Sequence, residues 1–319
     1  MSMQRISTTG TLAHRLCGSV AAIGVFDGVH RGHQKVIARA VAEARRMKVL
    51  SVVVTFDPHP VHVLYPGKFL PQITTLEHRL RLIEDCGVDV CVVVKFNRRF
   101  AAQRPEKFVR EFLVKQLGVK KVVIGRDFHF GRAGQGSVDL LRSMEATDGF
   151  VVEHLGISCC AGKSIKSTYI RELISEGDLP AVKRCLARPY SFLGKVVGGD
   201  ARGRRIGYPT ANFRKENVVI LPSGIYLVRA AWDKKTAHGL CYIGRRPTFK
   251  RSGARVIQEL HLLDHRVDLY GKMICMEFIR KLRDDRKFSD EEALVAQIAK
   301  DVRKARAFFK MPAVPKLTF

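Results

Sequence analysis

Two histidines, His30 and His33, lie three residues apart in a glycine-rich turn, and imidazoles at this spacing can contact one phosphate from two sides. An apolar run that starts near residue 20 ends at Phe26, and helical spacing of apolar residues begins at residue 34. A strand that enters a helix through such a turn presents the free N–H groups of the helix to a ligand above the sheet. In isolation, capping and packing of the turn would be an equally good role for the histidines. The strand, the glycines and the helix around them favour a phosphate.

A second candidate phosphate site lies at the start of another expected helix. Ser167 or Thr168 suits the N-cap of this helix, whose apolar face includes Ile170. Arg171 in the first turn is unfavourable for the helix dipole unless it binds an anion that it shares with the helix N-terminus. An exposed arginine on a surface helix is the commoner case, and the Ser-Thr pair favours a phosphate site modestly.

Residues 198–212 are too rich in glycine and arginine for a core element, and their backbone could wrap a polyphosphate. No Gly-Lys-Ser/Thr follows, so this is not a Walker loop. Thr210 and Asn212 are neutral oxygen ligands two residues apart on an extended segment, so their side chains point to the same side. Such a pair can hold Mg²⁺ that is otherwise bound by water and nucleotide. A solvated basic loop explains the stretch equally well.

Glu259 is the candidate base of the second half. In the strand-like stretch 256–264, alternation places Ile257, Glu259 and His261 on one face. A carboxylate flanked by apolar residues is either paired with a cation or poised as a general base. Structural pairing is the commoner of the two.

The elements that must position these side chains change character along the chain. Up to about residue 186, Val- and Ile-rich strands alternate with amphipathic helices, which predicts a parallel sheet covered on both faces. The expected strands are residues 20–26, 50–56, 89–96, 120–125 and 150–155, and the expected helices are residues 34–46, 74–85, 104–117 and 138–145. Ligands bind such sheets at the carboxyl ends of the strands, where the loops at Asp27, Asp57 and Arg126 begin.

From Arg188 onward, short alternating strands separated by Gly, Pro and charged turns predict an antiparallel barrel or sandwich. These strands are expected at residues 191–197, 224–232, 239–243, 256–263 and 272–280. A helix over residues 289–309 closes the chain, with Ser289 as its N-cap and Glu292 as the capping-box partner.

The composition limits the partners and the compartment. The chain of 319 residues is long enough for two domains, and no apolar run approaches the ~20 residues of a membrane span. We therefore expect no membrane partner, and the lack of an apolar stretch before residue 18 argues against a secretory signal. Eight scattered Cys without a C-x-x-C pair indicate reduced thiols and a cytoplasmic location.

The balance of 56 Lys and Arg against 30 Asp and Glu gives a net charge of +26, which attracts polyphosphates, nucleic acid and anionic lipid alike. A basic RNA-binding protein is therefore the rival from another functional class. It should show interleaved exposed aromatics or a known module, and the single Trp argues weakly against that. We expect no specific nucleic-acid partner.

Together these stretches resemble the bacterial bifunctional riboflavin kinase/FMN adenylyltransferase (FAD synthetase) family over essentially the whole chain. In the first half the matching motifs are GVFDGVHRGH (24–33), TFDPHP (55–60), GRDFHFG (125–131) and IKSTYIR (165–171). In the second half they are GYPTAN (207–212), LPSGIY (221–226), RPTF (246–249), ELHLLD (259–264), DLYG (268–271), and LR (282–283) with KF (287–288). One such motif is a weak signal, whereas this many in the order of the family are a strong one.

The resemblance implies an α/β + β fold. An N-terminal Rossmann-like nucleotidyltransferase domain, residues 1–186, would carry a parallel sheet with helices on both faces. A riboflavin kinase domain, residues 187–319, would be a six-stranded antiparallel β-barrel with a C-terminal helix. The second domain would use ATP to phosphorylate riboflavin to FMN, and the first would adenylylate FMN with a second ATP, giving FAD and pyrophosphate. Mg²⁺ would assist, the partners would be small molecules, and the chain would be a monomer or a transient homo-oligomer.

The resemblance also implies roles for individual residues. In the adenylyltransferase, ATP and its phosphates would contact Gly24, Phe26, Asp27, Gly28, His30, His33, Asp127, Ser167, Thr168 and Arg171, with His30 and His33 catalytic. FMN would contact Pro58, Pro60 and Phe128 there. In the kinase, ATP would contact Gly203, Gly207, Pro209, Thr210 and Asn212, of which Thr210 and Asn212 would also hold Mg²⁺. Arg283 would contact the flavin, and Glu259 would take the hydroxyl proton.

The sequence departs from the family at a few positions. Lys166 stands where a serine is usual and Tyr169 where a basic residue is frequent, which could weaken adenylylation. Tyr242 replaces the usual asparagine, and residues 265–266 replace a phenylalanine-centred turn, which could alter flavin fit in the kinase. None of these changes removes a residue assigned to chemistry, so we expect both activities. The nearest rival is another H-x-G-H adenylyltransferase, of the nicotinamide mononucleotide or phosphopantetheine type, which would have no reason to carry PTAN with Glu259.

Overall fold

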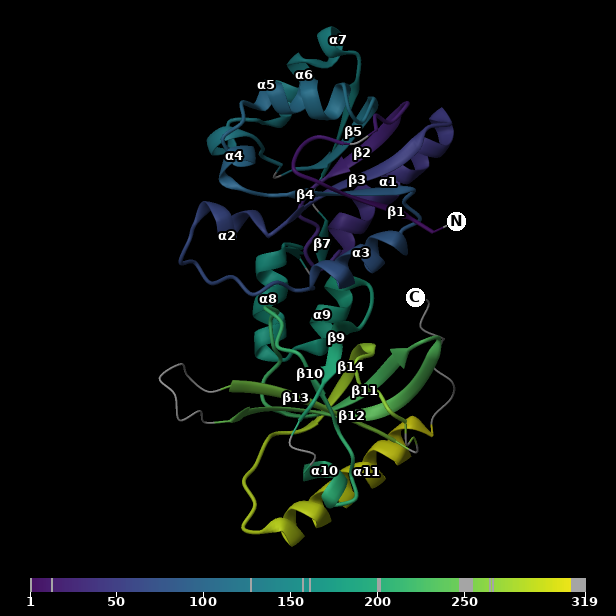
Figure 1. Ribbon diagram of the computed structural model, residues 1–319, viewed down its shortest axis with the longest axis vertical. Helices are drawn as coiled ribbons and strands as arrows, with labels where there is room; N and C mark the ends of the chain where they lie inside the picture. Colours follow the sequence, from purple (N-terminus) through teal and green to yellow (C-terminus); the bar gives the residue numbers. More distant parts are fainter. Residues whose placement is uncertain are drawn as a thin grey trace. The chain divides into compact units, whose positions relative to one another are not determined.

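The computed structural model describes residues 2–310 except residues 13, 127, 157, 161, 200–201, 247–254, 264 and 266. The chain forms two compact units, residues 1–167 and 168–319, each with its own sheet (Figure 1). The predicted domain boundary between residues 186 and 187 stays a prediction. Helices α8 (Ser167–Glu176) and α9 (Leu179–Leu186) lie between these two positions in the chain.

The first unit is built on a six-stranded sheet in which all paired strands are parallel, as predicted. In spatial order the strands are β1 (Gln4–Thr8), β4 (Val90–Lys95), β3 (Leu50–Asp57), β2 (Ser19–Ile23), β5 (Val119–Gly125) and β6 (Val151–Leu155). Strand β1 was not expected, because its only large apolar residue is Ile6 and four of its five residues are polar or charged. As an edge strand, β1 is held mainly by backbone hydrogen bonds to β4, so its sequence need not show the apolar pattern of a buried strand.

Helices cover both faces of this sheet because its strands are apolar on both sides. Helices α1 (Arg31–Met47) and α3 (Leu76–Glu84) pack on the face that includes Val20, Ala22 and Val53. The opposite face packs against residues 108–117 and against α6 (Val138–Ser143). The helix expected over residues 104–117 is a short α5 (Pro105–Lys107) followed by a π-helix, Phe108–Val114. Its wider turn is seen where the Leu117 amide donates to the Phe112 carbonyl, five residues back.

The order of the strands reverses at β2, which lies between β3 and β5. In parallel sheets this reversal opens a crevice outside the carboxyl ends of the strands, where ligands bind. The turn that follows β2 leads directly into α1, and the loops after β3 and β5 begin at the same edge. This edge therefore positions the predicted histidine site.

The second unit is a closed antiparallel barrel, which confirms the six strands implied by the resemblance. Around the barrel the strands are β10 (Ala211–Phe213), β13 (Arg255–Leu262), β12 (Lys235–Arg246), β11 (Gly224–Trp232), β14 (Met273–Arg283) and β9 (Tyr190–Val197). Tyr226 and its cross-strand partner Cys241 are fully buried, and Tyr226 packs edge to face on Phe278. These residues fill the barrel, and burial raises the pKa of the Cys241 thiol.

The residues that alternate with them face outward and meet the last helix, α11 (Glu291–Phe309). Leu227 and Leu240 of the barrel share one apolar cluster with Val302 and Ala305 of α11. The N-cap of α11 is Asp290, whose carboxylate accepts from the Ala293 amide at 2.8 Å, so the expected cap at Ser289 is wrong by one residue. The remaining short elements are α2 (Pro60–Leu64), α4 (Arg98–Ala101), the 3₁₀ helix η2 (Arg132–Gly134), α7 (Glu145–Asp148), β7 (Cys159–Cys160), β8 (Lys163–Ser164) and α10 (Arg202–Arg205).

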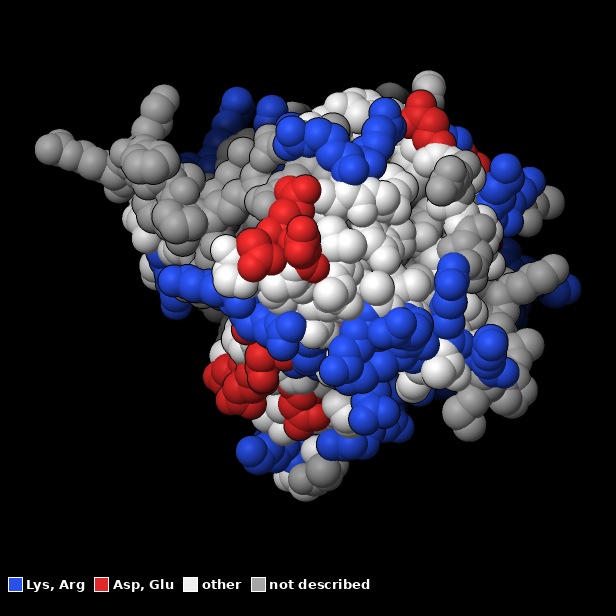
Figure 2. All heavy atoms as spheres, turned by 90° about the horizontal axis from the view of Figure 1, so that it is seen from below, with Lys and Arg blue, Asp and Glu red and all other residues white. Residues whose placement is uncertain are grey.

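Charge is unevenly spread over the surface. On the face seen in Figure 2, Lys and Arg side chains occupy much of the rim, while Asp and Glu gather in a few small groups. Helix α11 contributes exposed cations at Lys300, Arg303, Lys304 and Arg306. Within the described ranges, no helix combines the length and the apolar character needed to cross a membrane.

Two candidate active sites

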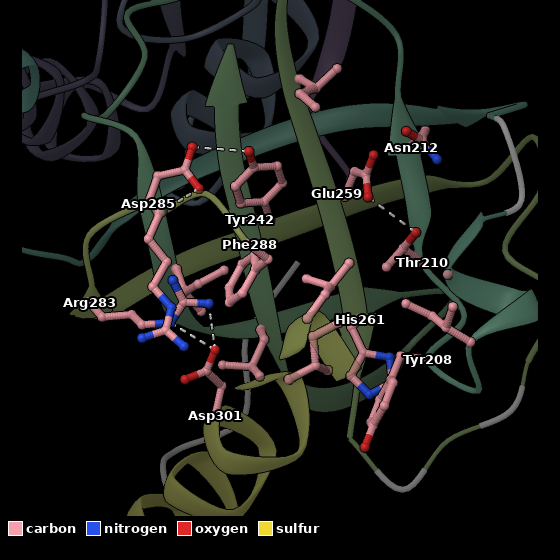
Figure 3. A pocket seen from close by; sticks show the side chains of 18 residues that line it. Tyr208, Thr210, Asn212, Tyr242, Glu259, His261, Arg283, Asp285, Phe288 and Asp301 are labelled. Carbon is pink, nitrogen blue, oxygen red and sulfur yellow. Dashed lines mark hydrogen bonds and ion pairs between the residues drawn. The ribbon is translucent and has the colours of Figure 1, made fainter. Parts of the chain in front are cut away.

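A cavity of about 320 Å³ lies on the outer face of the barrel, beside α11, and we call it the barrel cavity. The register of the sheet places one row of side chains across five neighbouring strands: Arg283, Ile225, Tyr242, Glu259 and Asn212. All five line the cavity (Figure 3). Because cross-strand neighbours project to the same face, the row alone brings a carboxylate, an amide, a phenol and a guanidinium to one wall.

Glu259 and Thr210 form the polar centre of this wall. The Thr210 hydroxyl donates to Glu259 Oε2 at 3.4 Å, and Asn212 is the cross-strand partner of Glu259 (Figure 3). The predicted alternation is confirmed, because Ile257, Glu259 and His261 all line the cavity, as do Thr210 and Asn212. A hydroxyl, an amide oxygen and a carboxylate are hard oxygen ligands that suit a hydrated Mg²⁺ shared with a nucleotide. Among the described residues there is no group of three or more His, Cys, Asp or Glu that could form an all-protein metal cage.

The segment before β10 is held so that Thr210 faces the cavity. His261 Nδ1 donates to the Pro209 carbonyl at 2.9 Å, and its ring packs edge to face on Tyr208. At Gly203 a Cβ would lie 2.4 Å from the Tyr208 carbonyl oxygen, so only glycine fits there. Gly207 has a φ of +85°, a conformation that favours glycine. These contacts explain why the predicted phosphate loop needs its glycines.

Arg283 closes the far end of the row. Its Nε and Nη2 donate to Asp301 Oδ2 at 2.9 and 2.7 Å, and Asp301 is buried on α11. Gln297 donates to the other oxygen of Asp301 at 2.7 Å. Arg283 therefore joins β14 to α11 as well as lining the cavity, and its predicted contact with a flavin stays a prediction.

In the first unit, the turn between β2 and α1, residues 24–33, brings the two histidines together, and we call it the histidine turn. His30 is the N-cap of α1, and its Nδ1 accepts from the His33 amide at 3.3 Å. The two rings are stacked with centroids 3.5 Å apart, and the Phe26 ring meets His33 edge to face. These contacts place both imidazoles at the N-terminus of α1, in the turn that follows the carboxyl end of β2.

The backbone of the histidine turn is strained and tightly anchored. Phe26 and Val29 have φ values of +54° and +37°, which are uncommon outside glycine, above all for the β-branched Val29. The buried Asp27 carboxylate accepts from the Ile73 amide at 2.9 Å and from the Thr74 amide at 3.1 Å. Asp27 was predicted to contact ATP or its phosphates; its carboxylate also fixes the turn to residues 73–74.

The other predicted residues of this site lie as follows. Ser167 donates from Oγ to the Asp27 carbonyl at 3.2 Å. Ser167 and Thr168 are the first two residues of α8, so both are inside the helix and the expected N-cap at one of them is wrong. Pro58 is exposed after β3, and Pro60 is the first residue of α2. Phe128 is half-buried after β5 and stacks on Phe130, with ring centroids 5.3 Å apart.

The predicted glycines lie in the histidine turn. At Gly24 a Cβ would lie 3.2 Å from the Phe26 ring, and Gly28 has a φ of +79°. Thr168 and Arg171 belong to α8 in the second unit, and Asp127 lies outside the described residues.

Two families of known proteins together match nearly the whole chain. The FAD synthetase family matches residues 12–169, and the riboflavin kinase family matches residues 186–309. The bifunctional riboflavin kinase/FMN adenylyltransferase of Escherichia coli strain K12 is 37% identical over 293 residues, 92% of this chain and 93% of that protein. The protein of the same name from Bacillus subtilis strain 168 is 39% identical over 297 residues, 91% of this chain and 92% of that protein. The chain belongs to the bifunctional riboflavin kinase/FMN adenylyltransferase family.

A solved structure shares the fold of this family member over nearly its full length. It is described as a macrolide-efflux protein from Streptococcus pneumoniae, is 27% identical, and superposes with a TM-score of 0.81. The likeness covers 95% of this chain and 99% of that chain. The match in fold and the matches in sequence therefore extend over both units.

Sequence reasoning missed a buried cation beneath the histidine turn. Arg79 of α3 is fully buried, and it donates to the Val25 carbonyl at 2.7 Å and to the Phe56 carbonyl at 3.1 Å. Burial lowers the pKa of this guanidinium, although the carboxylates of Asp27 and Asp57 oppose that shift. Arg79 therefore links the ends of β2 and β3, from which the histidine turn and the loop with Pro58 start. The sequence pattern does not identify Arg79 as buried, because its neighbours on α3 are polar on one side and apolar on the other.

We predict that Arg79→Met lowers the free energy of unfolding by about 2–5 kcal/mol, since two buried carbonyl groups lose their donor. Urea denaturation of the full chain measures this loss. Arg81→Met is the matched control: Arg81 lies on the same helix but is partly exposed and pairs with Glu77, so it should cost less than about 1 kcal/mol. Equal losses in the two variants would contradict the bridging role of Arg79.

Proposed function

We propose that riboflavin is phosphorylated in the barrel cavity and that FMN is adenylylated at the histidine turn. As a member of its family the chain makes FMN from riboflavin and ATP, and FAD from FMN and a second ATP. The kinase assignment depends on three oxygen-bearing side chains on one wall of the cavity: Glu259 accepts from Thr210 Oγ1 at 3.4 Å and is the cross-strand partner of Asn212.

In the barrel cavity, Glu259 would accept the proton of the ribityl 5′-hydroxyl as that oxygen forms its bond to the γ-phosphorus of ATP. The bond between the γ-phosphorus and the oxygen of ADP breaks in the same step. Thr210 and Asn212 would hold the phosphates and Mg²⁺, and the bound ion would neutralise phosphate charge. Phosphoryl transfer depends mainly on positioning and charge neutralisation, so few side chains suffice. Gly203, Gly207 and Pro209 would shape the loop around the nucleotide, and Arg283 would contact the flavin.

In the histidine turn, a phosphate oxygen of FMN would attack the α-phosphorus of ATP, and pyrophosphate would leave. His30, His33 and the N-terminal amides of α1 would stabilise the charge that grows on the α-phosphate. Ser167, Thr168 and Arg171 would hold the departing phosphates. Pro58, Pro60 and Phe128 would contact the flavin of FMN.

The remaining parts of the proposal concern partners and place. Small-molecule substrates account for the positive surface in part, since ATP, FMN and pyrophosphate are all polyanions. We infer a cytoplasmic protein that is a monomer or a transient homo-oligomer and has no specific nucleic-acid partner. Strong, steeply salt-dependent binding of RNA at physiological salt would overturn the last point.

The test is incubation of the purified chain with riboflavin, ATP and Mg²⁺, with the flavins separated by chromatography. We expect FMN to accumulate first and FAD to follow, and a chelator should stop both. Supplying FMN in place of riboflavin should give FAD alone. Riboflavin that stays unchanged would refute the kinase assignment, and FMN that stays unchanged would refute the adenylyltransferase assignment.

A further inference from the structure

Tyr242 occupies the middle of the row that lines the barrel cavity. It is the cross-strand partner of Glu259 on one side and of Ile225 on the other. Its side chain brings to the cavity wall a hydroxyl that the proposed phosphoryl transfer does not use.

The Tyr242 hydroxyl donates to Asp285 Oδ2 at 3.1 Å (Figure 3). Asp285 belongs to residues 284–288, which follow β14 and which we call the cavity segment. Asp285 Oδ1 accepts from the Arg286 amide at 2.9 Å, so the same carboxylate also orders the cavity segment itself. The bond from Tyr242 thus attaches the cavity segment to strand β12.

A glycine permits this arrangement. A Cβ at Gly244, two residues along β12, would lie 2.1 Å from the Tyr242 hydroxyl oxygen. The phenol therefore extends along the strand over Gly244 to reach Asp285. Any side chain at residue 244 would displace it.

The cavity segment carries part of the cavity wall. Asp285, Arg286 and Phe288 all line the barrel cavity. The Arg286 guanidinium lies over the Phe288 ring at 4.8 Å and donates to Gln297 of α11 at 2.5 Å. The segment is therefore held by α11 on one side and by Tyr242 on the other.

The row shows which part of a substrate this wall would contact. Asn212 lies on the neighbouring strand to one side of Glu259, and Tyr242, Ile225 and Arg283 lie on successive strands to the other side. At about 4.8 Å between strands, Arg283 is about 14 Å from Glu259 along the row. In the kinase site proposed above, the phosphates would lie at the Asn212 end. The ring system of riboflavin, remote from the reacting hydroxyl, would then lie at the end with Tyr242 and the cavity segment.

We propose that Tyr242 is a positioning residue for riboflavin: its bond to Asp285 holds the cavity segment in the conformation that binds the flavin ring. This inference rests on the kinase site proposed above. Without the bond the segment would spend less time in the binding conformation, and the apparent affinity for riboflavin would fall by that fraction. The ATP end of the cavity and Glu259 would be unaffected.

The test compares Tyr242→Phe with the wild-type chain in steady-state kinase assays. Because the bond is made to an exposed carboxylate, its loss should raise the KM for riboflavin by only about three- to tenfold. The kcat and the KM for ATP should stay within about twofold, a split that general destabilisation would not produce. Asp285→Ala should raise the same KM at least as much, and adding Tyr242→Phe to it should have no further effect.

Tyr190→Phe is the matched control. The Tyr190 hydroxyl donates to the Val219 carbonyl at 2.7 Å, so this variant also loses one tyrosine hydrogen bond in the barrel, away from the cavity lining. Its KM for riboflavin should equal that of the wild type. An unchanged KM in Tyr242→Phe, an equal rise in Tyr190→Phe, or additive effects with Asp285→Ala would each overturn the proposal. If Tyr242→Phe folds poorly, Asp285→Ala removes the same bond from an exposed residue. Kinase activity that survives Glu259→Gln would instead refute the site on which the inference rests.

Discussion

Replacing Glu259 with glutamine should lower the rate of FMN formation by about 10²–10⁴-fold, because removal of a positioned general base has effects of this size. The change keeps the shape of the side chain, and Thr210 and Asn212 stay in place to hold the phosphates. The kcat should therefore fall much more than the affinity for ATP or riboflavin. Chromatography of flavins after incubation with riboflavin, ATP and Mg²⁺ measures the loss.

The same variant provides an internal control. When FMN is supplied, Glu259→Gln should convert it to FAD at the wild-type rate, since the histidine turn is built from residues of the other unit. Parallel loss of both reactions would contradict separate sites. Retention of FMN formation would show that Glu259 has only a structural role, such as accepting the hydrogen bond from Thr210.

Replacing either histidine of the histidine turn should lower FAD formation by about 10²–10³-fold, the size expected when a donor to developing phosphate charge is lost. His30 needs a particular variant, because it is also the N-cap of α1. In His30→Asn the amide oxygen can still accept from the His33 amide, so the cap is kept and the imidazole is removed. His33→Ala removes the second imidazole and leaves the cap intact. The assay is FAD formation from FMN and ATP.

Comparison of His30→Ala with His30→Asn distinguishes the role of His30 as the N-cap of α1 from its proposed role in catalysis. His30→Ala should lose FAD formation to the same extent as His30→Asn but should also lower the free energy of unfolding by about 0.5–2 kcal/mol. Both variants should phosphorylate riboflavin normally. If His30→Asn keeps wild-type FAD formation while His30→Ala loses it, the histidine serves the helix and not the phosphate.

The fold could be read from the sequence where local pattern and tertiary environment agree. Strand β4, for example, is apolar at every position except its last, Lys95, because both faces of the sheet are covered. Strand β1 could not be read, because an edge strand is held by backbone pairing. The sequence did not predict the π-helix at residues 108–114 for another reason: apolar residues spaced four and five apart fit both an α-helix and a π-helix.

The sequence predicts the part of the site that follows period-two alternation, namely Glu259 with His261 and Thr210 with Asn212. It does not predict the contacts between residues that lie far apart in the chain. The contacts of Asp27 with residues 73–74 and of Arg283 with Asp301 depend on loop closure and on the docking of α11. Tyr242 was visible only as a departure from the family, and its bond to Asp285 depends on the register of β12 and on Gly244.

The two sites are completed at different times during synthesis, because α11 follows all the strands in the chain. All six strands of the parallel sheet, and the histidine turn, are synthesised before the first barrel strand. The barrel cavity, in contrast, lacks a wall until Leu294, Ile298 and Asp301 are added, which happens only after every barrel strand has been made. Loss of residues 284–309 would therefore remove this wall and abolish phosphorylation of riboflavin, while every strand of the parallel sheet would stay in place.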